Sequence, residues 1–336
     1  MTEEVNRRLA KVPIWLQTAE DVLAGSMPDV KTGKQCTSPY NCPYKALCEP
    51  LDPPRPEHPI ELLPDAAGKK LANKLHLTKG YTSILDPTSD ELQGAQADLY
   101  FRIQQAHRTG QQIVVPGADE VLAGYGYPRY YFDFEGIDLP VPLWTGVRPY
   151  EQIPFQWSCH IERAPGVFDH GEFLDLSGND PSLACIQQMQ KVINQYDNGP
   201  IFVYFATYER GRLQELKQRH PQYADLLQPY IDRLVDLLPI VKQHFYHPSM
   251  QGSFSIKKVL PVIAPDLDYG SLDEVHDGTG AQVAYLKAAL EPHVPAQQKA
   301  ETESNLRHYC RQDTWAMVEV AYFLAGVGRP VRPYGM

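Results

Sequence analysis

The sequence predicts an α/β protein in which helices flank a mixed sheet, with a small, mostly helical region at the N-terminus. Three strand-like apolar runs, at 130–134, 153–161 and 171–176, follow one another across loops. A run with helical periodicity at 181–196 comes next and leads into a further strand-like run at 200–205. This order indicates three antiparallel strands joined through a helix to a fourth strand of the same sheet.

The composition fits a protein with a substantial core, since 43% of the 336 residues are hydrophobic. The formal net charge of −10 argues against a general nucleic-acid coat, because non-specific binding needs a basic surface. It allows a nuclease, whose acidic centre faces a local basic groove. No apolar run is long enough to cross a bilayer, and the N-terminus lacks the apolar core of a signal peptide. We therefore expect a cytoplasmic protein without a membrane partner.

Changes in sequence texture divide the chain into four parts. Residues 49–65 are rich in proline and acids, which is typical of a stiff linker. The expected parts are a cysteine-rich segment with this linker, a small helical connecting region, the α/β domain and a tail, at 1–65, 66–127, 128–326 and 327–336. Hydrophobic periodicity predicts further helices at 4–16, 232–246, 255–263, 279–290 and 296–325.

Three of the six cysteines lie close together, in the pattern C-x5-C-x5-C formed by Cys36, Cys42 and Cys48. Thiolates at this spacing suit Zn²⁺ or a 4Fe-4S cluster, both of which normally take four ligands. A fourth ligand would be a distant residue or would lie outside this chain. The alternative is three buried free thiols, or a site that has lost its metal. The scattered positions of the other cysteines argue against a disulfide framework.

The first strand-like run carries two carboxylates near its end, Asp133 and Glu135. Because side chains alternate along a strand, both acids face one side of the sheet, while Phe132 and Phe134 face the other. Two carboxylates side by side on a buried strand repel each other and lose hydration. Such a pair persists where a divalent cation neutralises it or one acid takes up a proton. The pair is therefore the start of a metal site or a solvated strand end.

Two further acids lie where they could join this pair. Glu209 follows the strand at 200–205 in the first turn of a helix, so it projects over the carboxyl edge of the sheet. Asp313 lies on a later helix, one turn after Tyr309 on the same face. His308, five residues before Asp313, is also a candidate to approach the site. Each residue alone has an ordinary structural explanation, and the metal-site hypothesis rests on the four acids together.

The order of these motifs resembles the DEDD superfamily of 3′–5′ exonucleases, which have a ribonuclease-H-like sheet. A strand-borne D-x-E, an acid after a central strand and a C-terminal Y-x3-D match, and the last resembles the tyrosine branch. His308 with Asp313 also fits the H-x4-D spacing of the histidine branch. The second motif departs from the pattern, because Glu209 stands where Asp is usual and Phe205 where the strand end usually offers Asn.

Residues 128–325 are also similar to a bacterial group known as domain-of-unknown-function family 2779. The similarity includes Asp133-Phe-Glu135, Gly252-Ser-Phe-Ser-Ile-Lys257 and Tyr309-Cys-Arg-Gln-Asp313. In that group a ribonuclease-H-like half often follows a RecB-like nuclease half that ends in cysteines. The cysteine cluster resembles the tail of such a half, similar to the iron–sulfur ends of CRISPR-associated nucleases. Relatives place the fourth cysteine far upstream, so we expect this chain to lack it together with the RecB-like core.

The resemblance implies a nuclease, most specifically a 3′–5′ exonuclease, that hydrolyses DNA or RNA with two Mg²⁺ or Mn²⁺ ions about 3.5–4 Å apart. The implied metal ligands are Asp133, Glu135, Glu209 and Asp313. Tyr309 would orient or deprotonate the attacking water. Two basic residues are weaker expectations for phosphate contacts: Arg210 directly after Glu209, and Lys257 after a glycine-serine turn that opens a helix.

Two other functions stay open at this point. The altered second motif is compatible with a catalytically weak or inactive nucleic-acid-binding module in a DNA repair or defence system. A glycosidase-like acid–base role for Asp133 and Glu135 is the other, although acids two residues apart on one strand flank a substrate poorly. Asp236, in Leu-Val-Asp-Leu-Leu, is expected to cap a helix or to act as a further acid.

Overall fold

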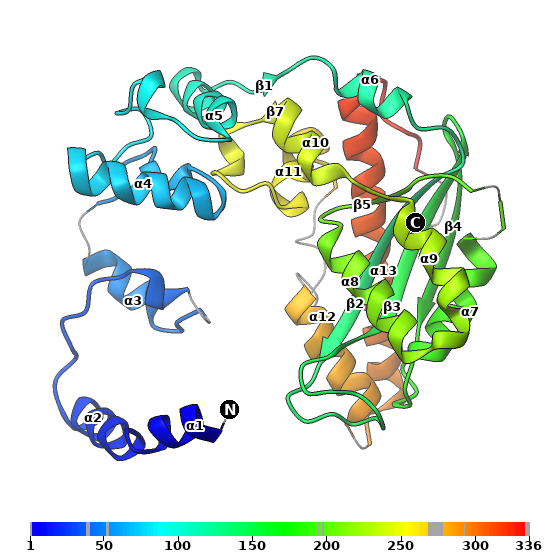
Figure 1. Cartoon of the computed structure of the whole chain (residues 1–336), viewed down its shortest axis with the longest axis horizontal. Helices are drawn as coiled ribbons and strands as arrows, with labels where there is room; N and C mark the ends of the chain where they lie inside the picture. The colour runs from blue at the N-terminus through cyan, green and yellow to red at the C-terminus, as the bar shows by residue number, and fades with distance from the viewer. Residues whose placement is uncertain are drawn as a thin grey trace. The chain divides into compact units, whose positions relative to one another are not determined.

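The computed structural model describes residues 2–37, 41–51, 54–193, 195–196, 198–267, 278–291 and 293–332 (Figure 1). The chain divides into two compact units, Met1–Pro59 and Ile60–Met336. Residues 333–336, the end of the expected tail, lie outside the described part. No helix within the described ranges has both the length and the apolar character needed to cross a membrane.

The first unit is helical, as the sequence predicts. Its helices are α1 (Thr2–Leu9), α2 (Val12–Ala24) and α3 (Lys45–Cys48), with 3-10 turns at Lys34–Cys36 and Glu49–Leu51. The expected single helix at 4–16 is instead α1 and part of α2. The break has a physical reason: Pro13 lies in the first turn of α2, where its missing amide hydrogen is tolerated, and it cannot continue α1.

The second unit contains a five-stranded mixed sheet with strand order β4-β3-β2-β5-β6. Its strands are β2 (Arg129–Asp138), β3 (Gln152–Ala164), β4 (Val167–Leu174), β5 (Ile201–Val203) and β6 (Leu234–Asp236). β3 pairs antiparallel with both β2 and β4, whereas β5 pairs parallel with both β2 and β6. The predicted mixed sheet, built from an antiparallel three-strand unit and a further strand, is confirmed.

The helix predicted at 232–246 is only partly confirmed. This stretch contains the end of α9 (Ala224–Asp232), then β6, α10 (Leu237–His244) and β7 (Phe245–Tyr246), which pairs with β1 (Ile113–Val114). The apolar residues Leu234 and Val235 fit a helix or a strand equally well by pattern. Parallel pairing with Ile201 and Phe202 of β5 makes them a strand.

Helices cover both faces of the sheet, because its side chains alternate between two cores. One core joins Phe132, Phe134 and Trp157 to helices α7, α8 and α9. The other joins Tyr131 and Phe155 to the helices that follow β6. These helices are α7 (Ser182–Ile193), α8 (Thr207–Arg219), α11 (Ile256–Ile263), α12 (Gly278–Tyr285) with a π-helical extension (Leu286–Leu290), and α13 (Ala296–Leu324). Figure 1 shows α13 running along the sheet, where it packs against β2 and β3.

The helical region before the sheet shares the second of these cores. Its helices are α4 (Asp65–Lys79), α5 (Ala97–Thr109) and α6 (Ala118–Ala123), with 3-10 turns at Ile60–Leu62 and Ser89–Glu91. Leu75 and Ile103 belong to the same buried cluster as Phe245 and Tyr246. His107 Nε2 lies 2.8 Å from the Tyr246 hydroxyl. Residues 60–127 therefore lie in one compact unit with the sheet.

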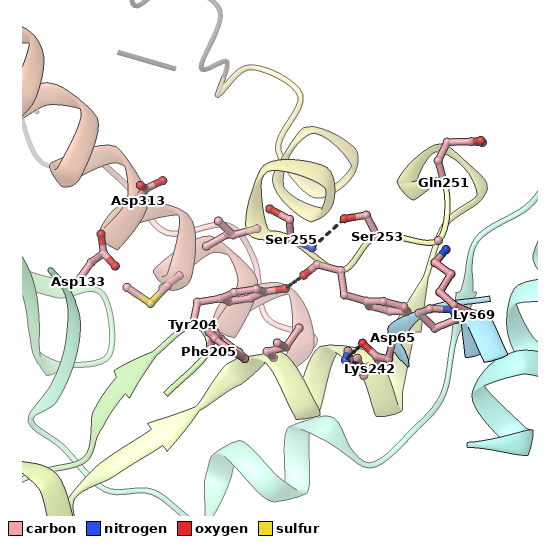
Figure 2. A pocket seen from close by; sticks show the side chains of 16 residues that line it. Asp65, Lys69, Asp133, Tyr204, Phe205, Lys242, Gln251, Ser253, Ser255 and Asp313 are labelled. Carbon is pink, nitrogen blue, oxygen red and sulfur yellow. Dashed lines mark hydrogen bonds and ion pairs between the residues drawn. The ribbon is translucent and has the colours of Figure 1, made fainter. Parts of the chain in front are cut away.

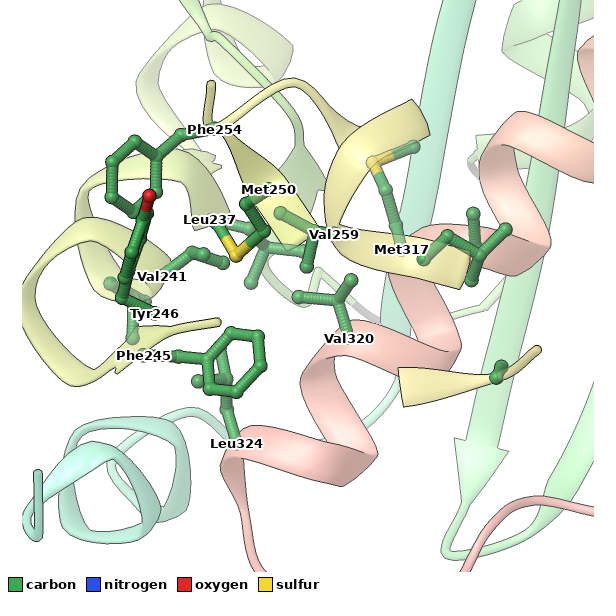
Figure 3. Packing of buried hydrophobic residues seen from close by; sticks show 14 of the residues in the cluster. Leu237, Val241, Phe245, Tyr246, Met250, Phe254, Val259, Met317, Val320 and Leu324 are labelled. Atoms are coloured by element: carbon green, nitrogen blue, oxygen red, sulfur yellow. The ribbon is translucent and has the colours of Figure 1, made fainter. Parts of the chain in front are cut away.

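The C-terminal half of α13 is fixed by α10 and α11. Figure 3 shows Leu237 of α10 and Val259 of α11 beside Met317 and Val320 of α13, all of them buried in the same cluster. A 3-10 turn (Pro248–Met250) and the loop after it connect β7 to α11. This packing holds in place the helix that carries Tyr309 and Asp313.

Replacing Gly252 in that loop with alanine is expected to lower the free energy of unfolding by about 2–4 kcal/mol. Its φ is +72°, and a Cβ here would clash with the backbone carbonyl of Leu62. Urea unfolding measures the loss. Gly211 is the matched control, because a Cβ there meets nothing within 4 Å inside helix α8. Gly211→Ala should leave stability unchanged or raise it by up to about 1 kcal/mol. Equal stability of the two variants would contradict the close packing at Gly252.

Candidate metal centre

Asp133 and Glu135 lie on β2, the middle strand of the sheet. Phe132 and Phe134 belong to the core on the opposite face, with ring centroids 4.6 Å apart. The register between β2 and β3 shifts directly after Glu135. Glu135 is only 7% exposed, so the pair is not a solvated strand end.

Asp313 joins these two acids from α13. One carboxylate oxygen from each of Asp133, Glu135 and Asp313 lies within 4.8 Å of the other two. Asp313 is 8% exposed. Among the described residues, these three acids form a group of metal-ligating side chains that converge closely enough to hold a metal ion. The packing of α13 on β2 and β3 brings the C-terminal acid over the central strand.

Glu209 is the fourth acid, and it reaches the group through Asp133. It lies in the first turn of α8, is 2% exposed, and shares a side-chain hydrogen bond with Asp133. Its Oε2 atom is buried and has no hydrogen-bond partner. A buried carboxylate oxygen without a donor is costly unless a ligand or cation satisfies it.

Asp236 holds the turn from which Glu209 projects. Its carboxylate accepts hydrogen bonds from the backbone amides of Phe205 (3.0 Å) and Ala206 (2.9 Å). It also accepts from Leu238 N at 3.0 Å and so caps α10. The expectation of a helix cap is confirmed, and the bonds to the β5–α8 turn add a role that sequence alone does not show.

The four acids form a strongly electronegative site, in which Glu135, Glu209 and Asp313 are buried and Asp133 is partly buried. Burial raises the pKa of Asp133 well above its usual range, and the nearby carboxylates of Asp313, Glu135 and Glu209 raise it further. Burial also raises the pKa of Glu209 to about 8. Without a cation Glu209 therefore largely retains its proton at neutral pH, and a bound cation would displace that proton.

Tyr309 is buried on α13, and its hydroxyl accepts a hydrogen bond from Lys257 Nζ at 2.7 Å. The ammonium also lies 4.7 Å from the centre of the Tyr309 ring. His308, in contrast, is exposed and hydrogen-bonds to Gln312. Lys257 was predicted as a phosphate contact, and the structure places it against the tyrosine of the site.

A cavity of about 580 Å³ opens beside the carboxylates and extends away from them (Figure 2). Asp133 and Asp313 line one end, and Met317 is also part of the lining. The remaining lining comes from two other regions of the chain: Pro64, Asp65 and Lys69 before the sheet, and Tyr204, Phe205, Leu238, Lys242 and residues 251–256 after it. Sequence patterns do not mark Lys69 and Lys242 as members of a site, because only long-range packing brings them to this cavity.

Two further predicted sites are Arg210 and the cysteine cluster of the first unit. Arg210 donates to the backbone carbonyl of Ile231 at 3.4 Å and does not line the cavity. In the first unit, Cys36 is buried and Cys42 N donates to Cys36 O at 2.9 Å, but residues 38–40 between them lie outside the described part. The three thiols of the cluster, including Cys48, are free. A metal or iron–sulfur centre there stays a prediction.

The model of a domain of unknown function, DUF2779, matches residues 130–255. The chain is similar to an uncharacterized protein of Mycoplasma pneumoniae, with 28% identity over 213 residues, which is 58% of this chain and 32% of the relative. An uncharacterized protein of Ureaplasma parvum is 24% identical over 238 residues, which is 65% of this chain and 34% of that relative. The chain thus spans about a third of the length of these curated relatives. No solved structure matches.

Proposed function

We propose that this protein is a metal-dependent nuclease that hydrolyses phosphodiester bonds of DNA or RNA, and specifically a 3′–5′ exonuclease. The observation that carries the proposal is the convergence of Asp133, Glu135 and Asp313 within 4.8 Å, with the unsatisfied oxygen of Glu209 beside them. Its closer definition as an exonuclease rests on the resemblance of the motifs to the DEDD superfamily. A cytoplasmic location remains part of the same proposal.

The donor set fits Mg²⁺ or Mn²⁺. All four side chains offer carboxylate oxygens, which hard divalent cations prefer, and four carboxylates supply enough charge for two such ions. When bound, the ions would supply charge neutralisation at the phosphate and a more acidic water. Asp133 contacts Glu209 and lies in the group with Glu135 and Asp313, so it is best placed to serve both ions.

The chain's own residues would orient the reactants. The Lys257 ammonium can only donate, so the Tyr309 oxygen accepts from it and the phenolic O–H is directed to an acceptor. This contact fixes the Tyr309 oxygen at the site, where it would orient or deprotonate the attacking water. The β5–α8 turn, fixed by Asp236, lines the cavity through Phe205 and leads into the first turn of α8, where Glu209 lies.

A specific observation keeps a second function open, that of a nucleic-acid-binding module with little turnover. Glu209 replaces the usual aspartate of the second motif, and its raised pKa makes it a weaker ligand near neutral pH. A glycosidase-like pair has no such support, because Asp133 and Glu135 point from one strand to the same spot.

The direct test is digestion of 5′-end-labelled and 3′-end-labelled single strands of DNA and RNA with millimolar Mg²⁺ or Mn²⁺, and with EDTA. A 3′–5′ exonuclease shortens the 5′-labelled strand stepwise and needs the metal. Calorimetry with Mn²⁺ should also detect binding. Metal binding without hydrolysis would favour the binding module, and a protein that neither binds Mn²⁺ nor digests any strand would refute both the metal site and the nuclease.

Replacing Tyr309 with phenylalanine is expected to lower the hydrolysis rate about 10²-fold, because it removes the group that orients the water. Lys257→Met should cause a smaller loss, since it removes only the donor to that hydroxyl. The kcat of each variant under saturating substrate gives the comparison. His308→Gln is the control and should keep the wild-type rate, and a larger loss for it than for Tyr309→Phe would reverse the assignment.

A further inference from the structure

The cavity beside the acids has a second, basic end. Lys242 Nζ lies 2.8 Å and 2.9 Å from the two carboxylate oxygens of Asp65, and Lys69 Nζ donates to the backbone carbonyl of Glu61. Figure 2 shows Lys69, Lys242 and Asp65 together at the end opposite to Asp133 and Asp313. Two ammonium groups and one carboxylate line this end, and the carboxylate of Glu61, outside the lining, lies near Lys69. The cavity therefore runs from a site for cations to a site that favours an anion.

Left-handed backbone conformations gather around this cavity. Asp65 (φ 59°), Phe205 (φ 78°) and Gln251 (φ 50°) are three of the five non-glycine residues with positive φ in the described part of the chain, and all three line the cavity. Each such conformation costs on the order of 1–3 kcal/mol and persists only where its surroundings impose it. Imposed strain of this kind is concentrated in binding clefts, which supports a built site rather than a chance hollow.

An exposed aromatic ring lies between the two ends. Phe205 is 53% exposed although it is a large apolar side chain, and its backbone amide is held by Asp236. Tyr204 beside it is held by a 2.7 Å hydrogen bond from its hydroxyl to the Phe254 carbonyl. Exposed rings next to a positively charged groove are the usual platform on which bases of single strands stack.

We propose that Lys69 and Lys242 form a second phosphate subsite, which binds the phosphate of the nucleotide next to the one being cleaved, with a base stacked on Phe205. This inference rests on the proposed nuclease function and makes a single-stranded polynucleotide the substrate, in preference to a mononucleotide ester. A mononucleotide would occupy only the acidic end and the aromatic middle. A volume of about 580 Å³ lies in the ordinary range of ligand sites and leaves room for more than the reacting phosphate.

The subsite also gives a role to the region before the sheet. Asp65 and Lys69 come from α4. The close approach of Gly252 to Leu62 holds the start of this region against the loop that contains Gly252, which forms another wall of the cavity. In the absence of substrate the Asp65 carboxylate pairs with the Lys242 ammonium, and a bound phosphate would compete with it for that ammonium.

The test compares Lys69→Gln, Lys242→Gln and Asp65→Asn in the full chain, with Lys70→Gln as the control. Lys70 follows Lys69 on α4, is exposed and does not line the cavity. Asparagine tolerates positive φ, so Asp65→Asn removes charge without forcing the backbone to change. Fluorescence anisotropy measures binding of a labelled single-stranded hexanucleotide at several salt concentrations with EDTA, and competition with a nucleoside monophosphate is measured beside it.

Each lysine variant is expected to weaken hexanucleotide binding about tenfold and to lower the salt dependence by about one phosphate contact. Asp65→Asn should strengthen binding about threefold, because it frees the two ammonium groups from a competing carboxylate. The lysine variants should bind the nucleoside monophosphate as the wild type does. The Lys70→Gln variant should bind the hexanucleotide as the wild type does.

Equal hexanucleotide binding by wild type and both lysine variants would overturn the subsite, as would an equal loss of hexanucleotide and monophosphate binding. Failure of the nuclease proposal looks different. In that case the wild type digests no strand with Mg²⁺ or Mn²⁺, while the binding differences among these variants still decide whether the subsite exists.

Discussion

Asp133→Asn is expected to lower metal-dependent strand hydrolysis at least about 10³-fold, the loss that follows when about 4 kcal/mol of transition-state stabilisation disappears. Asp133 contacts Glu209 and converges with Glu135 and Asp313, so it is the acid that links the whole group. Asparagine keeps the shape of the side chain but cannot supply the negative charge that two cations need. Digestion of end-labelled strands over a time course measures the loss of hydrolysis, and Mn²⁺ calorimetry measures the loss of cation binding.

The fold of this variant should survive. In the wild type the Asp133 carboxylate lies among other acids. Removing its charge lowers the repulsion between them, so the thermal stability of the metal-free variant should equal or exceed that of the wild type. Asp138→Asn is the matched control, because Asp138 lies on the same strand but outside the converging group. Wild-type hydrolysis by Asp133→Asn, or an equal loss in Asp138→Asn, would show that the site lies elsewhere.

Glu209→Gln is expected to stabilise the metal-free protein at alkaline pH by on the order of 3 kcal/mol. Burial raises the pKa of Glu209 to about 8 from 4.5. Between these two values the folded state binds more protons than the unfolded state, so the stability of the wild type falls as pH rises through this window. Glutamine carries no charge at any pH, so the variant escapes that loss, and the difference should vanish near pH 4.5.

Urea unfolding in EDTA from pH 4.5 to 8.5 measures this difference. Glu120→Gln, which changes an exposed acid on α6, should instead follow the wild-type pH profile. Mn²⁺ at pH 8 should stabilise the wild type more than Glu209→Gln, because the cation needs the ionised carboxylate. Parallel pH profiles for wild type and Glu209→Gln would mean that Glu209 is not held in a buried, proton-binding state.

The parts of the fold that the sequence predicted are those set by local pattern. The helix expected at 296–325 is α13, Ala296–Leu324, because its apolar periodicity is long and uninterrupted. Alternation on β2 correctly separated the acids from Phe132 and Phe134. The strand β6 escaped prediction, because three residues carry too little pattern and only pairing with β5 identifies them.

The candidate site also has a part that the sequence predicted and a part that it did not. The four acids are found by motif spacing, but the contacts that position them join distant parts of the chain. Lys242 meets Asp65 across 177 residues, Lys257 meets Tyr309 across 52, and Asp236 meets Phe205 across 31. No periodicity or motif encodes such pairs in one sequence, so the cavity and its basic end became visible only in the folded chain.

The position of α13 has a practical consequence for dividing this protein into pieces. The stretch matched by the DUF2779 model, residues 130–255, contains every strand of the main sheet but neither α13 nor the helices before β2. A fragment cut to that stretch would lack Asp313, expose the apolar face formed by Tyr131 and Phe155, and lose the wall built by α4. The smallest piece worth expressing is thus the whole unit from Ile60 onward, and sequence similarity marks a shorter interval than folding requires.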